Sequence, residues 1–327
     1  MIKRNKISKN PIIFLVGPTG SGKTELSLSL AKELNAEIIS ADSRQVYKFL
    51  NIGTAKPSQK YLSKIKHHFV DILKPDEFFS AGKFGNLARE IIDKNVEKNK
   101  PTIICGGSGF YIQAILGMIF DNSTTDKKIR ANIYEKGEKI GWNKLWEELK
   151  INDPEYAKTF SKNDKKRIAR SFEIFEITGK YPTEHFKEQK NQFSYDYLIV
   201  GLKCPRNILY EKINNRVDKM IKNGLVEEVQ NILNMGYNEK LNSLNTVGYK
   251  EIIKYFNKEY SLLKAITEIK KKTRNYAKRQ LTWFRKYSPH FWFEYKKTLP
   301  KDKMVKKIIS IINRQTKERS TKKHYHF

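Results

Sequence analysis

The stretch FLVGPTGSGKT, residues 14–24, constrains the fold of this chain more than any other part of its sequence. An apolar run leads into it, the helix-forming stretch ELSLSLAKEL follows it, and its spacing matches the pattern G-x-x-x-x-G-K-[ST]. Glycines in such a loop let successive backbone N–H groups and a helix N-terminus face an anion. The sequence therefore predicts a strand, a phosphate-binding loop and a helix, but the motif alone does not identify the molecule that carries the phosphate.

Every residue of this loop is a candidate for the phosphate site. Lys23 supplies a positive charge, and the Thr24 hydroxyl is the expected ligand of a magnesium ion, Mg²⁺. The expected phosphate-binding residues are Gly17, Pro18, Thr19, Gly20, Ser21, Gly22, Lys23 and Thr24.

Buried runs and helical stretches alternate up to about residue 118. AEIISADS (36–43) predicts a second strand, residues 80–98 predict a helix, and PTIICGGSGFY (101–111) predicts a strand that ends in glycines. This alternation predicts an α/β fold, a P-loop NTPase-like parallel sheet flanked by helices with right-handed crossovers. In such a sheet, ligands gather at the carboxyl ends of the strands.

The pattern becomes mainly helical after residue 120 and returns to a strand at YDYLIVGLKC (195–204). Residues 128–150 and 154–178 are predicted to be mostly helical, and Gly179 is a plausible C-cap. Long helices are predicted at 207–234 and 261–287. We therefore expect four parts: the first part of the α/β core at 1–120, an inserted helical subdomain at 121–192, the rest of the core and C-terminal helices at 193–312, and a polar tail at 313–327.

The formal net charge of +29 has two interpretations. A compositional bias would spread lysines over the whole surface, whereas a polyanionic partner would require basic residues in clusters. The two cysteines, Cys105 and Cys204, suggest neither a disulfide framework nor a zinc site, which favours a reducing cytosol. No apolar run approaches the roughly 20 residues that span a bilayer. We expect a cytoplasmic protein without membrane contact, and a monomer.

The predicted carboxyl edge of the sheet carries further polar residues. Asp42, in SADSRQVY (40–47), should lie on the same side as the phosphate loop. It could be a general base, a magnesium ligand, or simply the cap of the next turn. A motor ATPase would end a strand in a metal-binding aspartate, but the run PTIIC ends in Cys105. This difference weakens the ATPase hypothesis.

The ordered series of motifs resembles the tRNA dimethylallyltransferases, also called tRNA isopentenyltransferases. The resemblance covers about residues 11–295. Its motifs are GPTGSGKT (17–24), SADSRQVY (40–47), NIGTAKP (51–57), HHFVDI (67–72), GGSGFYI (106–112), DKKRIARSFEIFEITG (164–179), RVDKMIKNGLVEEV (216–229), VGYKE (247–251) and TRNYAKRQLTWFR (273–285). Ser108 stands where threonine is most common in the family. The zinc-finger extension of eukaryotic relatives is absent, so the chain resembles the bacterial form.

The resemblance implies that the phosphate loop binds dimethylallyl diphosphate. The allyl group would move to the exocyclic amine, N6, of adenosine 37 beside the anticodon of tRNA, and diphosphate would leave. Lys23 and magnesium on Thr24 would stabilise the charge that develops on the leaving group, and Asp42 would receive the amine proton. Arg216 is the candidate second cation on the diphosphate, with an ordinary helix-surface arginine as the alternative.

Two sets of residues are expected to contact tRNA. The stretch TRNYAKRQLTWFRK (273–286) interleaves basic and aromatic residues and contains no acid, which favours nucleic acid, although its rings could instead face the core. From this stretch we expect Arg274, Lys278 and Arg279 to bind RNA. The family resemblance implies contacts from Asp42, Ser43, Arg44, Gln45, Ser108, Lys166, Arg167, Ile168, Ala169 and Arg170.

Other hypotheses stay open at this point. A small-molecule P-loop kinase would share the loop and the sheet but would not need the basic stretches. An adenylate isopentenyltransferase would not need the helical insertion, and an ATP-gated RNA-binding protein is disfavoured by the missing strand-end aspartate. His67, His68 and Asp71 could suggest a metal site, but without further spaced ligands we expect a structural role for them.

Overall fold

The computed structural model describes residues 11–119, 125–188, 193–286, 289–294 and 301–322 of the chain. The chain divides into two compact units. The sheet unit holds the residues up to Phe78, Glu90–Gly109 and the residues from Ser194 on, and the helical unit holds Phe79–Arg89 and Phe110–Phe193. Each unit is described by itself below.

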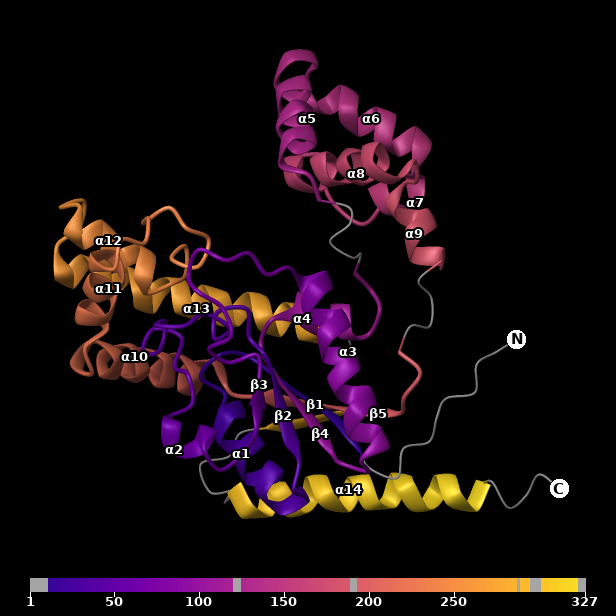
Figure 1. Ribbon diagram of the computed structural model, residues 1–327, viewed down its shortest axis with the longest axis vertical. Helices are drawn as coiled ribbons and strands as arrows, with labels where there is room; N and C mark the ends of the chain where they lie inside the picture. Colours follow the sequence, from indigo (N-terminus) through magenta and orange to yellow (C-terminus); the bar gives the residue numbers. More distant parts are fainter. Residues whose placement is uncertain (1–10, 120–124, 189–192, 287–288, 295–300, 323–327) are drawn as a thin grey trace. The chain divides into compact units, whose positions relative to one another are not determined.

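The sheet unit is built on a six-stranded sheet with the order β3-β2-β4-β1-β5-β6 (Figure 1). Its strands are β1 (Ile12–Val16), β2 (Glu37–Ala41), β3 (His67–His68), β4 (Thr102–Gly106), β5 (Tyr197–Lys203) and β6 (Phe291–Glu294). All five pairings are parallel. This confirms the predicted P-loop NTPase-like parallel sheet. β1, β2 and most of β4 are buried, as expected for strands covered by helices on both faces.

The sheet unit also contains helices. They are α1 (Lys23–Leu34), α2 (Gln59–Leu62), α3 (Ala81–Glu97), which begins in the helical unit and ends in this one, α10 (Arg206–Lys222), α11 (Leu225–Asn234), α12 (Tyr249–Phe256), α13 (Leu262–Lys286) and α14 (Lys301–Lys322). In Figure 1, α14 runs along the sheet beside α1. Leu30 of α1 and Ile308 of α14 pack with Ile13 and Val200 of the sheet in one fully buried cluster. Burial of these apolar side chains stabilises this layer.

Two predicted boundaries in the sheet unit are wrong. The helix expected at 207–234 is two helices, because Gly224 has φ 94°, a left-handed conformation that breaks the helix between α10 and α11. The tail expected from residue 313 is still helical, since α14 continues to Lys322. Residues 313–322 contain neither glycine nor proline, so the backbone meets no local obstacle to continuing the helix.

The helical unit contains short helices around its own core. They are α4 (Gly109–Ile115), which begins at the end of the sheet unit, α5 (Lys127–Ile140), α6 (Trp142–Asn152), α7 (Pro154–Ala157), α8 (Lys165–Thr178) and α9 (Pro182–Glu188). Trp142, Leu145, Ile168 and Phe172 are among the buried residues of this core. Gly179 ends α8 in a left-handed conformation, which confirms the predicted C-cap.

Both stretches expected to be mostly helical are helical, and each is divided into two helices. Residues 128–150 form α5 and α6 with Gly141 between them, and residues 154–178 form α7 and α8. Asp164 caps the new N-terminus, because its side chain accepts the Arg167 N–H. Such a cap satisfies an N–H group that has no partner within the helix, so an acidic residue after the turn at 158–163 favours a fresh start.

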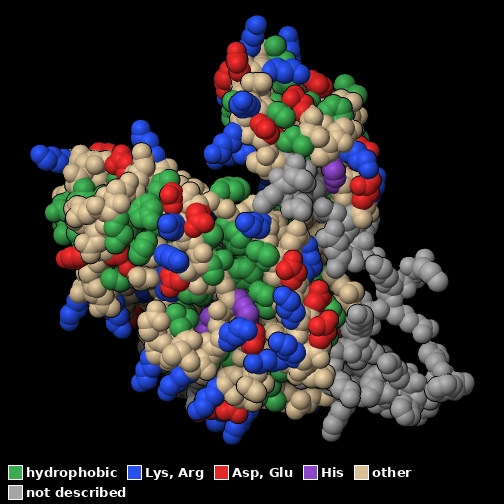
Figure 2. Space-filling view, viewed as in Figure 1, with side chains coloured by type: hydrophobic (Ala, Val, Ile, Leu, Met, Phe, Trp, Pro, Cys, Tyr) green, Lys and Arg blue, Asp and Glu red, His purple; other side chains and the backbone are tan. Residues whose placement is uncertain are grey.

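The surface carries both signs of charge. On the face drawn in Figure 2, acidic side chains lie between the Lys and Arg side chains of each unit. Much of the net charge of +29 is therefore spread over the surface, as a compositional bias predicts. Among the described residues, no helix combines the length and the apolar character that crossing a membrane requires.

Candidate active site

The carboxyl ends of three neighbouring strands meet at one point of the sheet. Gly106, the last residue of β4, is paired in register with Val16 of β1 and with Ala41 of β2. The residues that follow these strands are Gly17, Asp42 and Gly107. The sheet register therefore brings the phosphate loop, the SADSRQVY motif and the GGSG motif together, as the predicted parallel sheet requires.

The phosphate loop ends at the N-terminus of α1. Gly22 is the N-cap residue, has φ 91°, and caps the helix without a side chain. The first N–H groups of α1 thus keep their capacity to bind an anion. Lys23 Nζ donates to the carbonyl of Pro18 at 2.8 Å and so folds its ammonium back over the loop. The Thr24 side chain is exposed at the first turn.

One hydroxyl of the loop is buried without a partner. Ser21 Oγ has no hydrogen-bond partner among the described residues, although the Ser21 residue is only 6% exposed. A buried polar group without a hydrogen bond costs free energy, and such groups often mark sites that are completed by water or a ligand. This orphaned hydroxyl fits a loop that binds an oxygen-rich group.

Lys23 lies among other ionisable groups. The pKa of the Lys23 ammonium is lowered to about 8, mainly by burial and in part by the charge of Arg216, whereas the charge of Asp42 acts in the opposite direction. Burial also raises the pKa of the Cys105 thiol, so this neighbour stays neutral at pH 7. A lysine with this pKa is partly neutral above pH 8, and an anion bound beside it would restore its charge.

Asp42 caps the turn that follows β2. Its Oδ1 accepts the backbone N–H of Arg44 at 2.9 Å and that of Gln45 at 3.4 Å. Within the described residues, no hydrogen bond reaches Oδ2. The charge of Asp42 also raises the pKa values of Lys23 and Arg216, so the carboxylate lies close to both cations. The cap hypothesis is thus correct, and it leaves one carboxylate oxygen for chemistry.

Arg216 reaches the phosphate loop from α10. Its Nη1 donates to Thr19 Oγ1 at 3.2 Å. Burial lowers the pKa of this guanidinium and Asp42 opposes that effect, but an arginine stays charged at any physiological pH. Arg216 is therefore not a solvated helix-surface arginine; it places a permanent positive charge beside Lys23.

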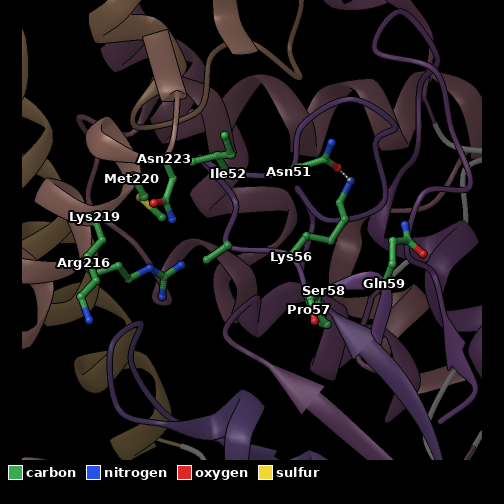
Figure 3. Close-up of a pocket in the computed structure, with 11 residues that line it drawn as sticks. Asn51, Ile52, Lys56, Pro57, Ser58, Gln59, Arg216, Lys219, Met220 and Asn223 are labelled. Atoms are coloured by element: carbon green, nitrogen blue, oxygen red, sulfur yellow. Dashed lines mark hydrogen bonds between the residues drawn. The ribbon is translucent and has the colours of Figure 1, made fainter. Parts of the chain in front are cut away.

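Arg216 also lines a pocket of about 480 Å³ between α10 and the NIGTAKP loop (Figure 3). The lining residues are Asn51, Ile52, Ala55, Lys56, Pro57, Ser58, Gln59, Arg216, Lys219, Met220 and Asn223. Lys56 is held in the pocket wall by the Tyr47 carbonyl at 2.9 Å, Asn51 Oδ1 at 2.8 Å and the Asp71 carboxylate. The Lys56 ammonium is thus already paired with groups of the protein.

The histidines have structural partners. His68 Nε2 hydrogen-bonds Glu37 Oε2 at 2.7 Å, His67 Nδ1 hydrogen-bonds the Ile65 carbonyl at 2.7 Å, and Asp71 pairs with Lys56. In the described part of the chain, no group of three or more His, Cys, Asp or Glu side chains could hold a metal ion. The expectation of a structural role for these residues agrees with their contacts.

Sequence reasoning missed Glu228, which shapes the pocket wall. Its carboxylate accepts the backbone N–H groups of Asn51, Ile52 and Gly53 at 2.8–3.2 Å, and the Tyr249 hydroxyl at 2.6 Å. A Cβ on Gly53 would lie 2.4 Å from the Tyr249 ring, so this close packing requires glycine. Nothing in the local sequence around residue 228 shows that it holds a loop far away along the chain.

The basic stretch 273–286 forms the end of α13, and its residues face different ways. Arg274 Nη1 donates to Asn214 Oδ1 at 2.7 Å, so this side chain lies against α10. Lys278 and Arg279 are exposed, with the Arg279 guanidinium over the Tyr276 ring. Gln280, which sequence reasoning also missed, is buried beneath them.

The residues expected to contact tRNA from the sheet unit differ in exposure. Gln45 is buried, where Nε2 donates to the Thr54 carbonyl at 3.3 Å and Oε1 accepts from Ser40 Oγ at 3.1 Å. Its expected RNA contact is wrong for the side chain, because both ends of the amide already hold the protein. Ser108 Oγ accepts the Ser43 N–H at 3.0 Å and so joins the two loops. Arg44 Nη1 donates to the Asn242 carbonyl at 2.6 Å and is partly exposed.

The residues of the helical unit that were expected to contact tRNA also differ in exposure. Ile168 and Ala169 are 0% and 1% exposed and belong to the core of the unit, so their side chains do not face RNA. Arg170 pairs with the buried carboxylate of Glu173 at 2.8 Å. Lys166 is exposed, and Arg167 is about half exposed beside Asp164. Lys166 and Arg167 are therefore exposed cations of this helix end, beside Lys165, which is exposed but pairs with Glu138.

The comparisons with known proteins agree with this geometry. The family model described as IPP transferase matches residues 45–287. A tRNA dimethylallyltransferase of Caldanaerobacter subterraneus is 45% identical over 288 residues, which cover 86% of this chain and 91% of that protein. The chain belongs to the tRNA dimethylallyltransferase family. The tRNA dimethylallyltransferase of Bacillus subtilis is 40% identical over 301 residues, covering 92% of this chain and 95% of that protein.

Solved structures of the tRNA dimethylallyltransferase family share the fold. The full-length tRNA isopentenylpyrophosphate transferase of Bacillus halodurans is 34% identical, with a TM-score of 0.71 over 97% of this chain and 100% of that one. A eukaryotic dimethylallyltransferase acting on tRNA is 27% identical, with a TM-score of 0.75 over 88% of this chain and 74% of that one. Membership makes the chain a prenyltransferase, and the small-molecule kinase and adenylate isopentenyltransferase hypotheses are not favoured.

Proposed function

We propose that this enzyme transfers the dimethylallyl group of dimethylallyl diphosphate to N6 of adenosine 37 in tRNA and releases diphosphate. The observation that carries the proposal is the meeting of Lys23, Arg216 and Asp42 at the carboxyl edge of the sheet. Lys23 and Arg216 each donate a hydrogen bond to the phosphate loop, and the charge of Asp42 raises the pKa values of both. Two cations suit a diphosphate, and a carboxylate beside them suits an amine that must lose a proton.

The leaving group is stabilised by the loop. As the bond between the allylic carbon and the diphosphate oxygen lengthens, negative charge grows on the diphosphate and positive charge on the allyl group. The N–H groups at the start of α1, Lys23 and Arg216 are fixed in advance to bind that negative charge. Preorganised donors of this kind lower the barrier because they need no reorganisation when the charge develops.

Asp42 acts as the base for the N6 amine. The N6 amine is a weak nucleophile because its lone pair is delocalised into the adenine ring, and it becomes acidic as it bonds to carbon. Asp42 Oδ1 is committed to the turn, so Oδ2 is the atom that accepts this proton. The charge of Asp42 raises the pKa values of Lys23 and Arg216, which places its carboxylate close to the two cations that would bind the diphosphate.

The residues fit a magnesium ion. Mg²⁺ keeps several waters and is commonly bound through one or two protein ligands and substrate phosphates. The exposed Thr24 hydroxyl, at the first turn of α1, matches the single protein ligand that such a site needs. A bound Mg²⁺ would neutralise part of the charge on the diphosphate, and the other roles above belong to side chains of the chain itself.

The acceptor is proposed to be the anticodon arm of tRNA. Lys278 and Arg279 on α13 and, in the helical unit, Lys166 and Arg167 are exposed cations that can contact phosphates. The expectation of a cytoplasmic monomer stays a prediction, which cell fractionation and light scattering would test.

One assay tests the proposed reaction. Unmodified tRNA is incubated with the enzyme, Mg²⁺ and labelled dimethylallyl diphosphate, and the digested nucleosides are separated. We expect label in N6-dimethylallyl adenosine from position 37 and release of one diphosphate per modified tRNA. ADP formation from ATP with a small acceptor, and no labelled nucleoside, would instead support a kinase.

A further inference from the structure

Gln280 is a buried amide in the middle of an otherwise basic helix end. It is 6% exposed, and both polar atoms of its side chain are hydrogen-bonded to backbone groups of other loops. We propose that Gln280 is a positioning residue for the diphosphate site, which holds the phosphate loop in its binding shape. The inference rests on the proposed function for the identity of the substrate, but not for the binding of diphosphate itself.

The first contact is to the phosphate loop. Gln280 Oε1 accepts the backbone N–H of Thr19 at 2.8 Å. Thr19 in turn accepts, through Oγ1, the hydrogen bond from Arg216 Nη1 at 3.2 Å. Gln280 therefore holds Thr19, the residue to which the Arg216 guanidinium donates its hydrogen bond. Without this acceptor the Thr19 N–H would lack a partner, and we would expect the loop to rearrange.

The second contact is to the loop after β4. Gln280 Nε2 donates to the carbonyl of Gly107 at 2.9 Å. The amide orientation is dictated by its partners, because an N–H group needs an acceptor and a carbonyl needs a donor. A Cβ on Gly107 would lie 2.1 Å from Nε2, so the side chain reaches its place only because residue 107 is glycine. Gln280 thus joins the loops after the neighbouring strands β1 and β4.

The rest of this helix side supports the loop after β4. Tyr276, Gln280 and Trp283 are spaced by four and three residues and so lie on one side of α13. Tyr276 interacts with Ser108, and a Cβ on Gly109 would lie 2.3 Å from the Trp283 ring. Lys278 and Arg279 are exposed. This side of the helix therefore contacts the loop after β4 at three residues and the phosphate loop through Gln280, while the exposed cations beside it can contact RNA.

The two roles of the helix can be separated by neighbouring substitutions. Gln280→Met keeps the length of the side chain and removes both hydrogen bonds. We expect its affinity for inorganic pyrophosphate with Mg²⁺, measured by calorimetry, to fall about tenfold or more, the usual effect of leaving a buried N–H unpaired. Its affinity for tRNA should stay within about twofold of the wild type. Lys278→Ala should show the reverse, with weaker tRNA binding and unchanged pyrophosphate binding.

A matched control and a second variant keep the test sharp. Gln230→Met makes the same substitution at an exposed glutamine of α11. Within the described residues its side chain hydrogen-bonds Asn234 of its own helix, so neither affinity should change. Gln280→Glu keeps an acceptor for Thr19 but places an oxygen against the Gly107 carbonyl. It should weaken pyrophosphate binding as well, and it reports on the site if Gln280→Met does not fold.

The proposal fails if a folded Gln280→Met variant binds pyrophosphate like the wild type, or if it loses tRNA affinity and keeps pyrophosphate affinity. Unfolding of both Gln280 variants would also overturn it, because Gln280 would then be required for the stability of the whole fold and not for the diphosphate site in particular. Both binding measurements are made without turnover. A wild-type enzyme that binds pyrophosphate but gives no prenylated nucleoside would refute the proposed function and still leave the Gln280 comparison readable.

Discussion

At the scale of single residues, the two oxygens of Asp42 have different tasks. Oδ1 accepts the backbone N–H groups of Arg44 and Gln45, and Oδ2 is the oxygen that we propose accepts the amine proton. In this proposal a structural role and a chemical role share one side chain. The two roles can be separated, because an asparagine keeps an oxygen acceptor for the turn but has no basic charge.

Asp42→Asn should leave binding intact and remove most of the turnover. We expect tRNA and pyrophosphate affinities close to wild type and a kcat lower by about 10²–10⁴, the usual effect of a positioned general base. Single-turnover kinetics with labelled dimethylallyl diphosphate measure this. Asp42→Ala, which also removes the turn cap, should lose thermal stability as well. Near-normal turnover in Asp42→Asn would rule out the general-base role.

Lys23 predicts a pH dependence of diphosphate binding. Burial lowers its pKa to about 8 in the free enzyme, below the ordinary value of 10.5, so the ammonium loses its proton as the pH rises through 8. Diphosphate binds the charged form of Lys23. The contribution of Lys23 to diphosphate affinity should therefore be constant below pH 7. Above pH 8 the affinity should fall by at most about tenfold per pH unit.

The measurement is a pH series of pyrophosphate affinities. Lys23→Arg is the control, because a guanidinium stays charged over the whole range and any remaining pH dependence then belongs to pyrophosphate. The difference between the two series isolates Lys23. Parallel curves for the wild type and Lys23→Arg would show that the pKa of Lys23 is not lowered.

At the scale of elements, distant helices hold the loops of the site in place. α11 supplies Glu228 to the NIGTAKP loop, α13 supplies Gln280 to the phosphate loop, and α10 supplies Arg216 to the same loop. The loops contain many backbone N–H groups that pair with no strand, and side chains from helices satisfy them. This is how irregular backbone stays rigid beside a reactive site.

Glu228→Ala should destabilise the sheet unit by about 2–3 kcal/mol. Three N–H groups and the Tyr249 hydroxyl lose a charged acceptor, and hydrogen bonds to charged groups contribute about 1.5–3 kcal/mol. Urea denaturation gives the free energy of unfolding. Glu227→Ala is the matched control, since it removes a neighbouring exposed carboxylate from the same first turn of α11. Equal stabilities of the two variants would contradict the role of Glu228.

At the scale of the whole molecule, charge is spread but only some of it is free. Arg170 and Arg274 are engaged with protein partners, while Lys166, Lys278 and Arg279 are exposed. A net charge of +29 therefore overstates the number of cations that can release counterions from RNA. Binding should depend on the exposed cations of a few helix ends and not on the total charge.

tRNA affinity should fall steeply with salt. Several phosphate contacts cost orders of magnitude in affinity between 50 mM and 200 mM salt. Removing both cations in Lys166→Ala/Arg167→Ala should weaken binding and reduce the slope of log affinity against log salt by roughly two. Lys303→Ala/Lys306→Ala, on the exposed face of α14, is the control with the same change in charge. Equal slopes for the two double variants would exclude the helical unit from the RNA interface.

The sequence by itself determined the features that are encoded locally. The phosphate loop, the parallel sheet and the place of Asp42 at a strand end follow from motif spacing and from buried runs that alternate with helices, because each depends on neighbours in the chain. The order of the motifs likewise identified the family. Residues such as Lys23 and Thr24 were therefore predictable before any contact was known.

Only the tertiary structure decided which side chains serve these loops. Gln280 and Thr19 are 261 residues apart, and Glu228 is 176 residues from Ile52, so no local pattern links them. The same is true of burial: Gln45, Ile168 and Ala169 lie within motifs that were expected to contact RNA, but their side chains are buried. Hydrogen bonding and burial depend on what packs opposite a residue, and that is set by the fold of the whole unit rather than by the residue's neighbours in sequence.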